Sequence, residues 1–282
     1  MIDPRDEAQL LRLAEQAAAA GAAILDELCV SARGGPVSFE RKASAIDLVT
    51  EADTRSEAAI VALLRASGLA IVAEEGSVIE GASGAADAVW YVDPLDGTTN
   101  YAFGHPCHCV SIGLVVGGQP RLGVVHAPAL GIVWSGGVAL ETTRRDLLGH
   151  RERRLSVSTV EAIEDGLLAT GFPYDRRTSS DDNLAAHHAL MKRALGVLRC
   201  GSAAIDLALV ADGTYAGYWE RKLKPWDLAA GASLVRAAGG TVTDPWGRAF
   251  DAVDGNVLAS NGRVHASLLT SLAPHLPIAP AR

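Results

Sequence analysis

The stretch Tyr91-Val-Asp-Pro-Leu-Asp-Gly-Thr-Thr-Asn100 is the part of the chain from which the fold is best predicted. It continues a β-prone run at 88–92, so two carboxylates, those of Asp93 and Asp96, come at the end of a strand. Pro94 favours extended geometry at Asp93, because the residue before a proline is excluded from the helical region. Carboxylates bind hard divalent cations, and this segment therefore predicts a metal site.

Gly97 allows a tight turn directly after the two acids. Thr98 and Thr99 are candidate N-caps of a helix that would begin there. A helix start binds phosphate through its free N–H groups, so one short segment can bind both metal and phosphate. A hairpin turn stays open as the alternative, because Asp-Gly is also a common turn, although Thr98-Thr99-Asn100 is a poor start for a second strand.

Length and composition limit the possible classes of protein. The chain has 282 residues, 49% of them hydrophobic, which suits one large domain or two intimately packed ones. A formal net charge of −8 excludes a general attraction for nucleic acid, so a phosphate-ester substrate would require metal ions to reverse the local field. The four cysteines show no disulfide framework, and no signal peptide or membrane span is evident. We therefore expect a cytoplasmic protein.

The pattern of predicted elements changes near residue 154, which predicts an N-terminal α+β portion at 1–154 and a C-terminal α/β portion at 155–282. The first portion has predicted helices at 6–29 and 54–67, strands at 69–73, 88–93, 107–117, 121–126 and 132–135, and a polar, basic surface loop at 141–154. The second has predicted strands at 155–158, 166–171, 197–199, 215–220, 240–243 and 256–259, and helices at 180–194, 203–212, 226–238 and 264–272.

Further acidic groups follow strands or begin helices in three other segments. Asp53 or Thr54 can cap the helix at 54–67, with Glu57 completing a capping box for Thr54. The glutamate pair at 74–75 ends a buried strand, and because neighbouring strand residues point to opposite faces, one of the two should face a site. Asp227 lies in the first turn of a helix, where it can also simply stabilise the helix dipole.

Two more segments contain side chains with possible chemistry. Gly201-Ser202-Ala203-Ala204 opens a helix after a strand, which predicts that its N–H groups are free for a ligand. His105, Cys107 and Cys109 alternate at strand spacing, but a single cluster is a weak zinc signal. Buried cysteines on a core strand are the favoured interpretation.

Taken together, these segments resemble the inositol monophosphatase family, within the superfamily of metal-dependent, lithium-sensitive sugar and inositol phosphatases. The resemblance covers nearly the whole chain, to about residue 273. It is carried by Asp93–Asn100 as a first motif, Trp226-Asp227-Leu-Ala-Ala-Gly231 as a second, the Glu74-Glu75 pair, the run from Lys42 through Asp47 to Asp53, and Gly201–Ala204 nineteen positions before Glu220. Ala73, Ala127-Pro128 and a longer 141–154 loop depart from the family pattern.

The resemblance implies two or three Mg²⁺ ions. Glu74, Asp93 and the backbone carbonyl of Leu95 would bind the first ion, and a weaker third ion would lie near Glu74. Asp93, Asp96 and Asp227 would bind the second, with Asp93 bridging the two. Glu74 also counts among the residues expected to take part in catalysis.

The resemblance also implies roles for residues that touch water and substrate. Gly97 and Thr98 would offer backbone N–H groups to the phosphate, while Asp53 and the Thr98 hydroxyl would orient and activate the attacking water. Glu220, helped by Asp96, would hold hydroxyls of the alcohol portion together with backbone groups of Gly201, Ser202 and Ala203.

The fold implied is an α/β protein, a layered α/β/α/β/α sandwich of the inositol monophosphatase and fructose-1,6-bisphosphatase type, assembled as a homodimer. The activity implied is Mg²⁺-dependent hydrolysis of a small phosphate monoester. Inositol 1-phosphate is the first choice, since a carboxylate at Glu220 suits a polyol. Histidinol phosphate, fructose 1,6-bisphosphate and 3′-phosphoadenosine 5′-phosphate stay open as substrates. A regulatory protein that associates with RNA polymerase or RNA is the alternative of a different class.

Overall fold

The computed structural model describes residues 4–31, 38–41, 48–81 and 87–279, and the Lys42 and Asp47 part of the predicted family run lies outside these ranges. Within them the helices are α1 (Pro4–Ser31), α2 (Glu51–Leu64), α3 (Thr98–Ala102), α4 (Leu184–Met191), α5 (Ala203–Ala211), α6 (Pro225–Ala237) and α7 (His265–Leu272). In the same ranges no helix is long and apolar enough to cross a membrane.

Most strands belong to two sheets. In the described ranges the large sheet has the order β10-β9-β8-β7-β6-β5-β3-β4 and the small sheet the order β12-β11-β13-β15-β14. The large sheet contains β3 (Ala70–Ala73), β4 (Val78–Ile79), β5 (Ala88–Asp96), β6 (Cys109–Val116), β7 (Gln119–Ala127), β8 (Ile132–Gly137), β9 (Leu140–Asp146) and β10 (Arg151–Arg154). The small sheet contains β11 (Leu167–Thr170), β12 (Gly196–Leu198), β13 (Gly217–Glu220), β14 (Thr241–Thr243) and β15 (Val257–Ser260), while β1 (Glu40–Arg41) pairs with β2 (Leu48–Val49).

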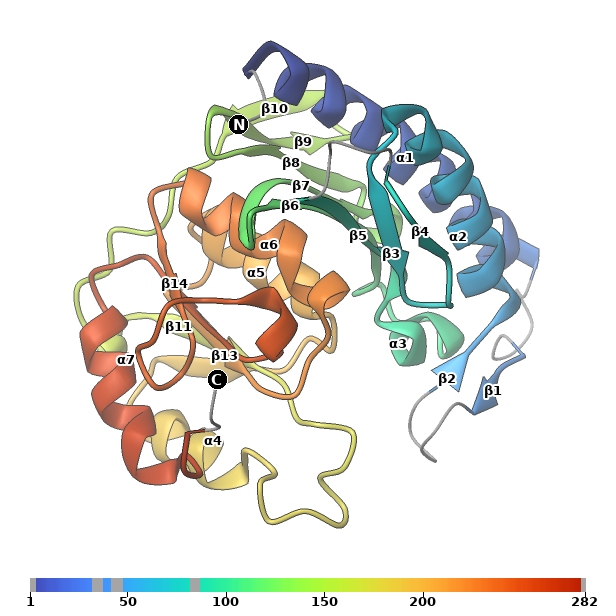
Figure 1. Ribbon diagram of the computed structural model, residues 1–282. Helices are drawn as coiled ribbons and strands as arrows, with labels where there is room; N and C mark the ends of the chain where they lie inside the picture. Colours follow the sequence, from blue (N-terminus) through green and yellow to red (C-terminus); the bar gives the residue numbers. More distant parts are fainter. Residues whose placement is uncertain (1–3, 32–37, 42–47, 82–86, 280–282) are drawn as a thin grey trace.

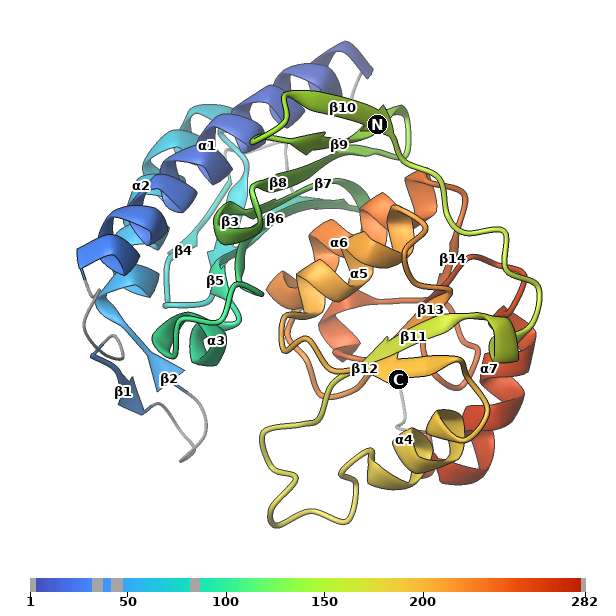
Figure 2. The ribbon, with the colours of Figure 1, turned by 180° about the vertical axis from the view of Figure 1, so that it is seen from behind.

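The elements stack in five layers, which confirms the predicted α/β/α/β/α sandwich. Figures 1 and 2 show α1 and α2 on the outer face of the large sheet, α5 and α6 between the two sheets, and α4 and α7 beyond the small sheet. The central layer has the largest apolar core, in which Trp134 of the large sheet and Tyr218 of the small sheet are fully buried. Because α6 packs on both sheets, the two halves of the chain meet along it. The division at residue 154 stays a prediction.

Two glycines of the large sheet bring α6 unusually close to the strands. A Cβ at Gly113 of β6 would overlap the backbone nitrogen of Ala230, and one at Gly123 of β7 would overlap the Ala230 carbonyl. Glycine within a strand often marks such a close approach of another backbone. The start of α6, where Asp227 lies, is therefore positioned by the absence of side chains on the sheet below it.

The prediction of a loop at 141–154 is wrong. The segment instead forms the hairpin of β9 and β10, in which Arg151 pairs with Asp146 and Arg154 with Thr143. Two of its basic side chains, those of Arg144 and Arg153, form ion pairs with the buried carboxylate of Asp212. Charged residues along an exposed edge strand also oppose pairing with other chains.

One predicted strand is absent from the described residues, and one predicted helix is shorter than expected. Residues 155–158 form no strand, since Leu155 and Val157 donate to the backbone carbonyls of Thr142 and Ala238 outside any ladder. The helix predicted at 180–194 is limited to α4, because Asn183 at its start has a left-handed φ of 69°.

Candidate active site

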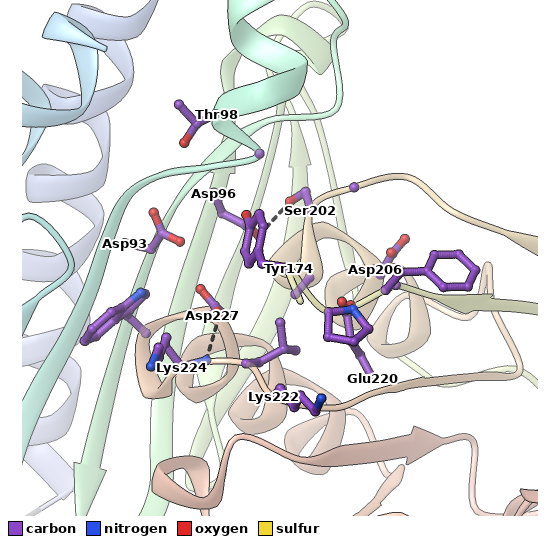
Figure 3. Close-up of a pocket in the computed structure, with 18 of the residues that line it drawn as sticks. Asp93, Asp96, Thr98, Tyr174, Ser202, Asp206, Glu220, Lys222, Lys224 and Asp227 are labelled. Atoms are coloured by element: carbon purple, nitrogen blue, oxygen red, sulfur yellow. Dashed lines mark hydrogen bonds between the residues drawn. The ribbon is translucent and has the colours of Figure 1, made fainter. Parts of the chain in front are cut away.

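A cavity of about 270 Å³ opens between the two sheets, at the point where strands of both end. It is lined by most of the predicted site residues, from both halves of the chain. Figure 3 shows several of them around the same space. The predicted residues that line it are Glu74, Asp93, Leu95, Asp96, Gly97, Thr98, Gly201, Ser202, Ala203, Glu220 and Asp227.

A bulge at the end of β5 turns both of its aspartates toward this cavity. On a regular strand, residues three positions apart point to opposite faces. Here the pairing with β6 shifts between Asp93, which is opposite Ser111, and Asp96, which is opposite Cys109. Bulges re-aim side chains in this way. The Asp93 carboxylate is held further by the backbone N–H of Leu95, at 2.9 Å.

Gly97 brings the first motif against the second half of the chain. Its φ of 91° is left-handed, and a Cβ there would lie 2.8 Å from the Cys107 carbonyl oxygen and 3.3 Å from that of Gly201. Gly97 is also the N-cap position of α3, and no side chain caps that helix, so the prediction of Thr98 or Thr99 as the cap was wrong.

We expect Gly97→Ala to lower the free energy of unfolding by about 2–4 kcal/mol, from backbone strain together with overpacking. Urea denaturation monitored by circular dichroism measures this change. Gly104→Ala is the matched control, because Gly104 has a similar φ of 72° but nothing within 4 Å of its Cβ position. Equal losses in both variants would mean that the close approach to Cys107 and Gly201 is unimportant.

Asp53 reaches the site through Thr98. The Thr98 hydroxyl oxygen lies 3.1 Å from Asp53 Oδ1 and 3.1 Å from the Leu95 carbonyl oxygen. Asp53 is buried in the first turn of α2, where its Oδ2 accepts the backbone N–H of Thr50 at 2.7 Å. Thr50 is therefore the N-cap of α2, and the predicted caps at Asp53 or Thr54 were wrong.

Asp227 is held in the same way as Asp53. It is the third residue of α6, and its Oδ2 accepts the backbone N–H of Lys224 at 2.8 Å. Ser111 of β6 donates to the carbonyl oxygen of Trp226 at 3.1 Å, which joins the start of α6 to the large sheet. Each aspartate thus stabilises the start of its helix and is also oriented by it.

Of the glutamate pair, Glu74 lines the cavity and Glu75 is not among the lining residues, in agreement with the expected alternation. Glu74 extends the pairing of β3 with β5, since its N–H donates to Val92. The turn that follows is held by Glu57, whose carboxylate accepts the N–H groups of Glu75 at 2.7 Å and Ser77 at 3.1 Å. Glu57 therefore supports Glu74 rather than completing a capping box.

Asp96 joins the two halves of the chain. Its Oδ2 accepts the Ser202 hydroxyl at 2.7 Å and the backbone N–H of Ala204 at 2.7 Å, at the start of α5. Ser202 also caps α5 by accepting the N–H of Ile205. The prediction that this helix start has N–H groups free for a ligand was therefore wrong for Ala204 and Ile205, because Asp96 and Ser202 accept them.

Burial and neighbouring charges raise the pKa of three carboxylates around the cavity, those of Asp93, Asp96 and Asp227. Burial raises the pKa of Asp93 well above its usual range, and the charges of Glu74, Asp96 and Asp227 add to this effect. Burial likewise raises the pKa of Asp96 to about 6 and that of Asp227 well above its usual range. Such a cluster is unfavourable when fully ionised, and a nearby positive charge would reverse the shifts.

In the described part of the chain, no three His, Cys, Asp or Glu side chains are grouped so that they could hold one ion among themselves. The fit to a divalent cation depends on the chemistry of the donors. The buried carboxylates of Asp93 and Asp96 and the half-buried carboxylate of Asp227 line the same cavity as Glu74 and Leu95. Oxygen donors of this kind suit Mg²⁺. Cys109, by contrast, is fully buried in the core, as predicted for a core strand.

Glu220 is the last residue of β13 and lines the same cavity. The Tyr218 hydroxyl donates to Glu220 Oε2 at 2.5 Å, and burial raises the pKa of Glu220 to about 7. Gly171, which sequence analysis did not single out, leaves room for this carboxylate, because a Cβ there would overlap it. A glycine directly after a short apolar strand was the available signal.

Other lining residues were also missed as site residues. They come from the segment after β11, from the turn before α5, from α5 itself, from the segment between β13 and α6, and from the first turn of α6. The members are Phe172, Pro173, Tyr174, Arg199, Asp206, Lys222, Leu223, Lys224 and Trp226. The lysines next to the second motif were visible in the sequence, but the segment after β11 has no motif that would place it there.

Comparison with known proteins adds a line of evidence that does not depend on the geometry of the site. The sequence model of the inositol monophosphatase family matches residues 6–277. A Synechocystis protein named inositol-1-monophosphatase is 40% identical over 278 residues, 97% of this chain and 92% of that protein. Nus factor SuhB of Pseudomonas aeruginosa is 41% identical over 235 residues, 82% of this chain and 84% of that protein. The solved structure of inositol monophosphatase from Anabaena (Nostoc) sp. is 37% identical, with a TM-score of 0.82, and the match covers 96% of this chain and 98% of that one.

Proposed function

Because the chain belongs to the inositol monophosphatase family, whose members are phosphatases of phosphate monoesters, we propose that it hydrolyses inositol 1-phosphate with Mg²⁺. The family implies a divalent metal in general, while Mg²⁺, the number of ions, lithium sensitivity and a homodimer are part of the proposal. The observation that supports it is the arrangement of acids from three separate segments, Glu74, Asp93 with Asp96, and Asp227, around one cavity.

In this proposal the acids hold the metal and the start of α3 holds the phosphate. Glu74, Asp93 and the Leu95 carbonyl would hold one ion. Asp93, Asp96 and Asp227, which are not grouped closely enough here to hold an ion among themselves, would move together around a second. A divalent ion bound there supplies Lewis-acid stabilisation of phosphoryl oxygens. Backbone N–H groups of Gly97 and Thr98 would bind the phosphate.

Thr98 and Asp53 would activate the attacking water. The Thr98 hydroxyl would orient that water opposite the leaving oxygen, and Asp53, 3.1 Å from Thr98 Oγ1, would hold the proton that the water loses. A P–O bond forms to the water and the P–O bond to the alcohol breaks. The alcohol oxygen takes a proton from solvent. The step uses no side-chain nucleophile, so no phosphoenzyme is expected.

Glu220 would select a polyol as the alcohol portion. Its carboxylate is buried at the end of the cavity away from the metal ligands, beside Tyr218. A carboxylate accepts hydrogen bonds from ring hydroxyls and disfavours an apolar or anionic group in the same place. Backbone groups of residues 201–203, which also line the cavity, would complete these contacts.

The test is a kinetic comparison of four substrates with Mg²⁺: inositol 1-phosphate, histidinol phosphate, fructose 1,6-bisphosphate and 3′-phosphoadenosine 5′-phosphate. We expect the highest kcat/KM for inositol 1-phosphate. Glu220→Gln should lower that preference more than it lowers kcat. Equal kcat/KM values on all four substrates would rule out the inositol assignment while leaving the phosphatase assignment in place.

The alternative of a different class is a regulatory protein that associates with RNA polymerase or RNA, which the printed name of the Pseudomonas relative suggests for that protein. The basic β9–β10 hairpin is the surface to test. Arg151 and Arg154 are exposed there, whereas Arg145 forms an ion pair with Glu15. Pull-down from lysate with the chain and with its Arg151→Glu/Arg154→Glu variant tests this role. RNA polymerase or RNA retained only by the unchanged chain would favour it.

A further inference from the structure

Lys222, two residues beyond Glu220, has an unusual backbone. Its φ of 63° is left-handed, a conformation that few residues other than glycine adopt without strain. Its side chain lines the cavity, and its ammonium group donates to Asp175 Oδ2 at 2.7 Å and to the Asp181 carbonyl oxygen at 3.1 Å. A strained backbone that persists is maintained by its surroundings, and here Lys222 contacts two points of one loop.

That loop, residues 172–182, runs between β11 and α4 without a helix or strand of its own. Figures 1 and 2 show it as the long yellow excursion before α4. Asn183 joins the two ends of the loop, since its buried side chain donates to the Gly171 carbonyl oxygen at 2.7 Å. The neighbouring Arg221, which is 4% exposed, forms an ion pair with the Asp181 carboxylate. The loop is therefore tied to the end of β13 by two consecutive basic residues.

The loop forms one wall of the cavity. Phe172, Pro173 and Tyr174 all line it, and Figure 3 shows Tyr174 and Lys222 among the side chains around that space. Tyr174 is 58% exposed and directly precedes Asp175, the partner of Lys222. The position of an aromatic ring at the site is thus adjacent to the point where Lys222 holds the loop.

We propose that Lys222 is a positioning residue that holds Tyr174 against the alcohol portion of the substrate, so that the Tyr174 ring sets the preference for a ring-sized alcohol. This inference rests on the proposed function. An aromatic face packs well on the C–H face of a cyclic polyol and gains nothing from a methyl group that cannot reach it. Tyr174 and Lys222 are not among the residues proposed to hold the metal, the phosphate or the attacking water, so the loop should affect substrate binding and leave the chemical step unchanged.

The ion pair itself contributes little to global stability. The Lys222 side chain is 33% exposed and that of Asp175 is 48% exposed, and such pairs contribute at most about 1 kcal/mol. Its effect is local, because it fixes a loop that lacks a ladder of backbone hydrogen bonds. Loss of the pair should therefore change the order of the loop without unfolding the protein.

Kinetics on two substrates tests the proposal. Lys222→Ala and Tyr174→Ala should each raise KM for inositol 1-phosphate about tenfold, or 1.4 kcal/mol, while kcat and the KM for methyl phosphate change less than about twofold. The double variant should be no worse than either single one, because both remove the same contact. Tyr174→Phe should retain the preference, and Lys222→Gly should behave like Lys222→Ala although it relieves the strained φ. Lys192→Ala, at an exposed lysine beyond α4, is the matched control for charge.

Hydrogen exchange adds a readout that requires no turnover. Amides of residues 172–182 should exchange faster in Lys222→Ala than in the unchanged chain, with the rest of the small sheet unaffected. Unchanged exchange in the loop, or equal rises of KM for both substrates, would overturn the proposal. Absence of turnover of both substrates by the unchanged chain would contradict the proposed function instead, and the exchange result would still decide the role of Lys222.

Discussion

Asp93→Asn is expected to lower kcat at least about a thousandfold while leaving the fold intact, since removing a buried group central to charge stabilisation in a site of this kind has such an effect. An amide has the same shape as the carboxylate and can still accept the Leu95 N–H through its oxygen. It lacks the charge that would hold two cations. Because burial and the charges of Glu74, Asp96 and Asp227 raise the pKa of Asp93, its replacement also removes repulsion in the metal-free protein.

Initial rates with Mg²⁺ measure the change in kcat, and thermal melting of the metal-free protein measures the change in stability. The melting temperature should be unchanged or higher. Asp212→Asn is the matched control, because Asp212 is also a buried carboxylate but forms ion pairs with Arg144 and Arg153 and is not among the residues that line the cavity. It should lower stability and leave kcat unchanged. Near-normal phosphatase activity of Asp93→Asn would show that the assignment of the metal ligands is wrong.

Removal of divalent ions should reduce turnover to background, and Mg²⁺ should restore it. The same ions should stabilise the folded protein, since a ligand that binds only the native state raises its stability by RT ln(1 + [L]/Kd), about 2.7 kcal/mol at a hundred times Kd. Thermal melting and initial rates after treatment with a chelator, with and without added Mg²⁺, measure both effects. Asp93→Asn serves again as the control, because its melting temperature should no longer respond to Mg²⁺.

The stabilisation by Mg²⁺ should depend on pH in a defined direction. The folded pKa values of Asp93, Asp96 and Asp227 lie above the unfolded value, so the metal-free folded state binds extra protons and loses stability as pH rises. For Asp96 that loss occurs between about pH 4 and pH 6 and is complete above its folded pKa of about 6. Protons compete with metal, so the gain from Mg²⁺ should grow from pH 5 to pH 8. Activity that survives the chelator, or a melting temperature insensitive to Mg²⁺ at pH 8, would contradict the metal assignment.

Most of the residues that the sequence singled out line one cavity, because the signals that identified them are local. A proline between two aspartates, a glycine after them and an aspartate in a helix's first turn restrict the backbone within a few residues. The elements around them were predicted for the same reason: β5, α5 and α6 lie close to their expected ranges, and α3 begins at Thr98, where a helix start was expected. A structural and a functional role are compatible at the same residue, since Asp53 and Asp227 accept backbone N–H groups at the starts of their helices and also lie at or beside the cavity.

The local predictions that were wrong concern residues whose partners lie far away in the sequence. Arg151 and Arg154 are exposed, as the prediction of a solvated face implied, but the hairpin and the pairing of Arg144 and Arg153 with Asp212, near the end of α5, were not predicted. The N–H of Ala204 was expected to be free, but Asp96 from the other half of the chain accepts it. Nothing in the 172–182 segment indicates that it forms a wall of the cavity, because its position depends on Lys222.

By itself, therefore, the sequence determined the family, the layered fold and the identity of the acidic groups, all of which depend on residues near one another in the chain. The tertiary structure alone decided which way these groups point. The register shift between Asp93 and Asp96, the close approach at Gly97 and the loop held by Lys222 each depend on contacts between segments far apart in sequence. The direction of a side chain is set by the register and packing of its neighbours, and these exist only when the whole chain has folded.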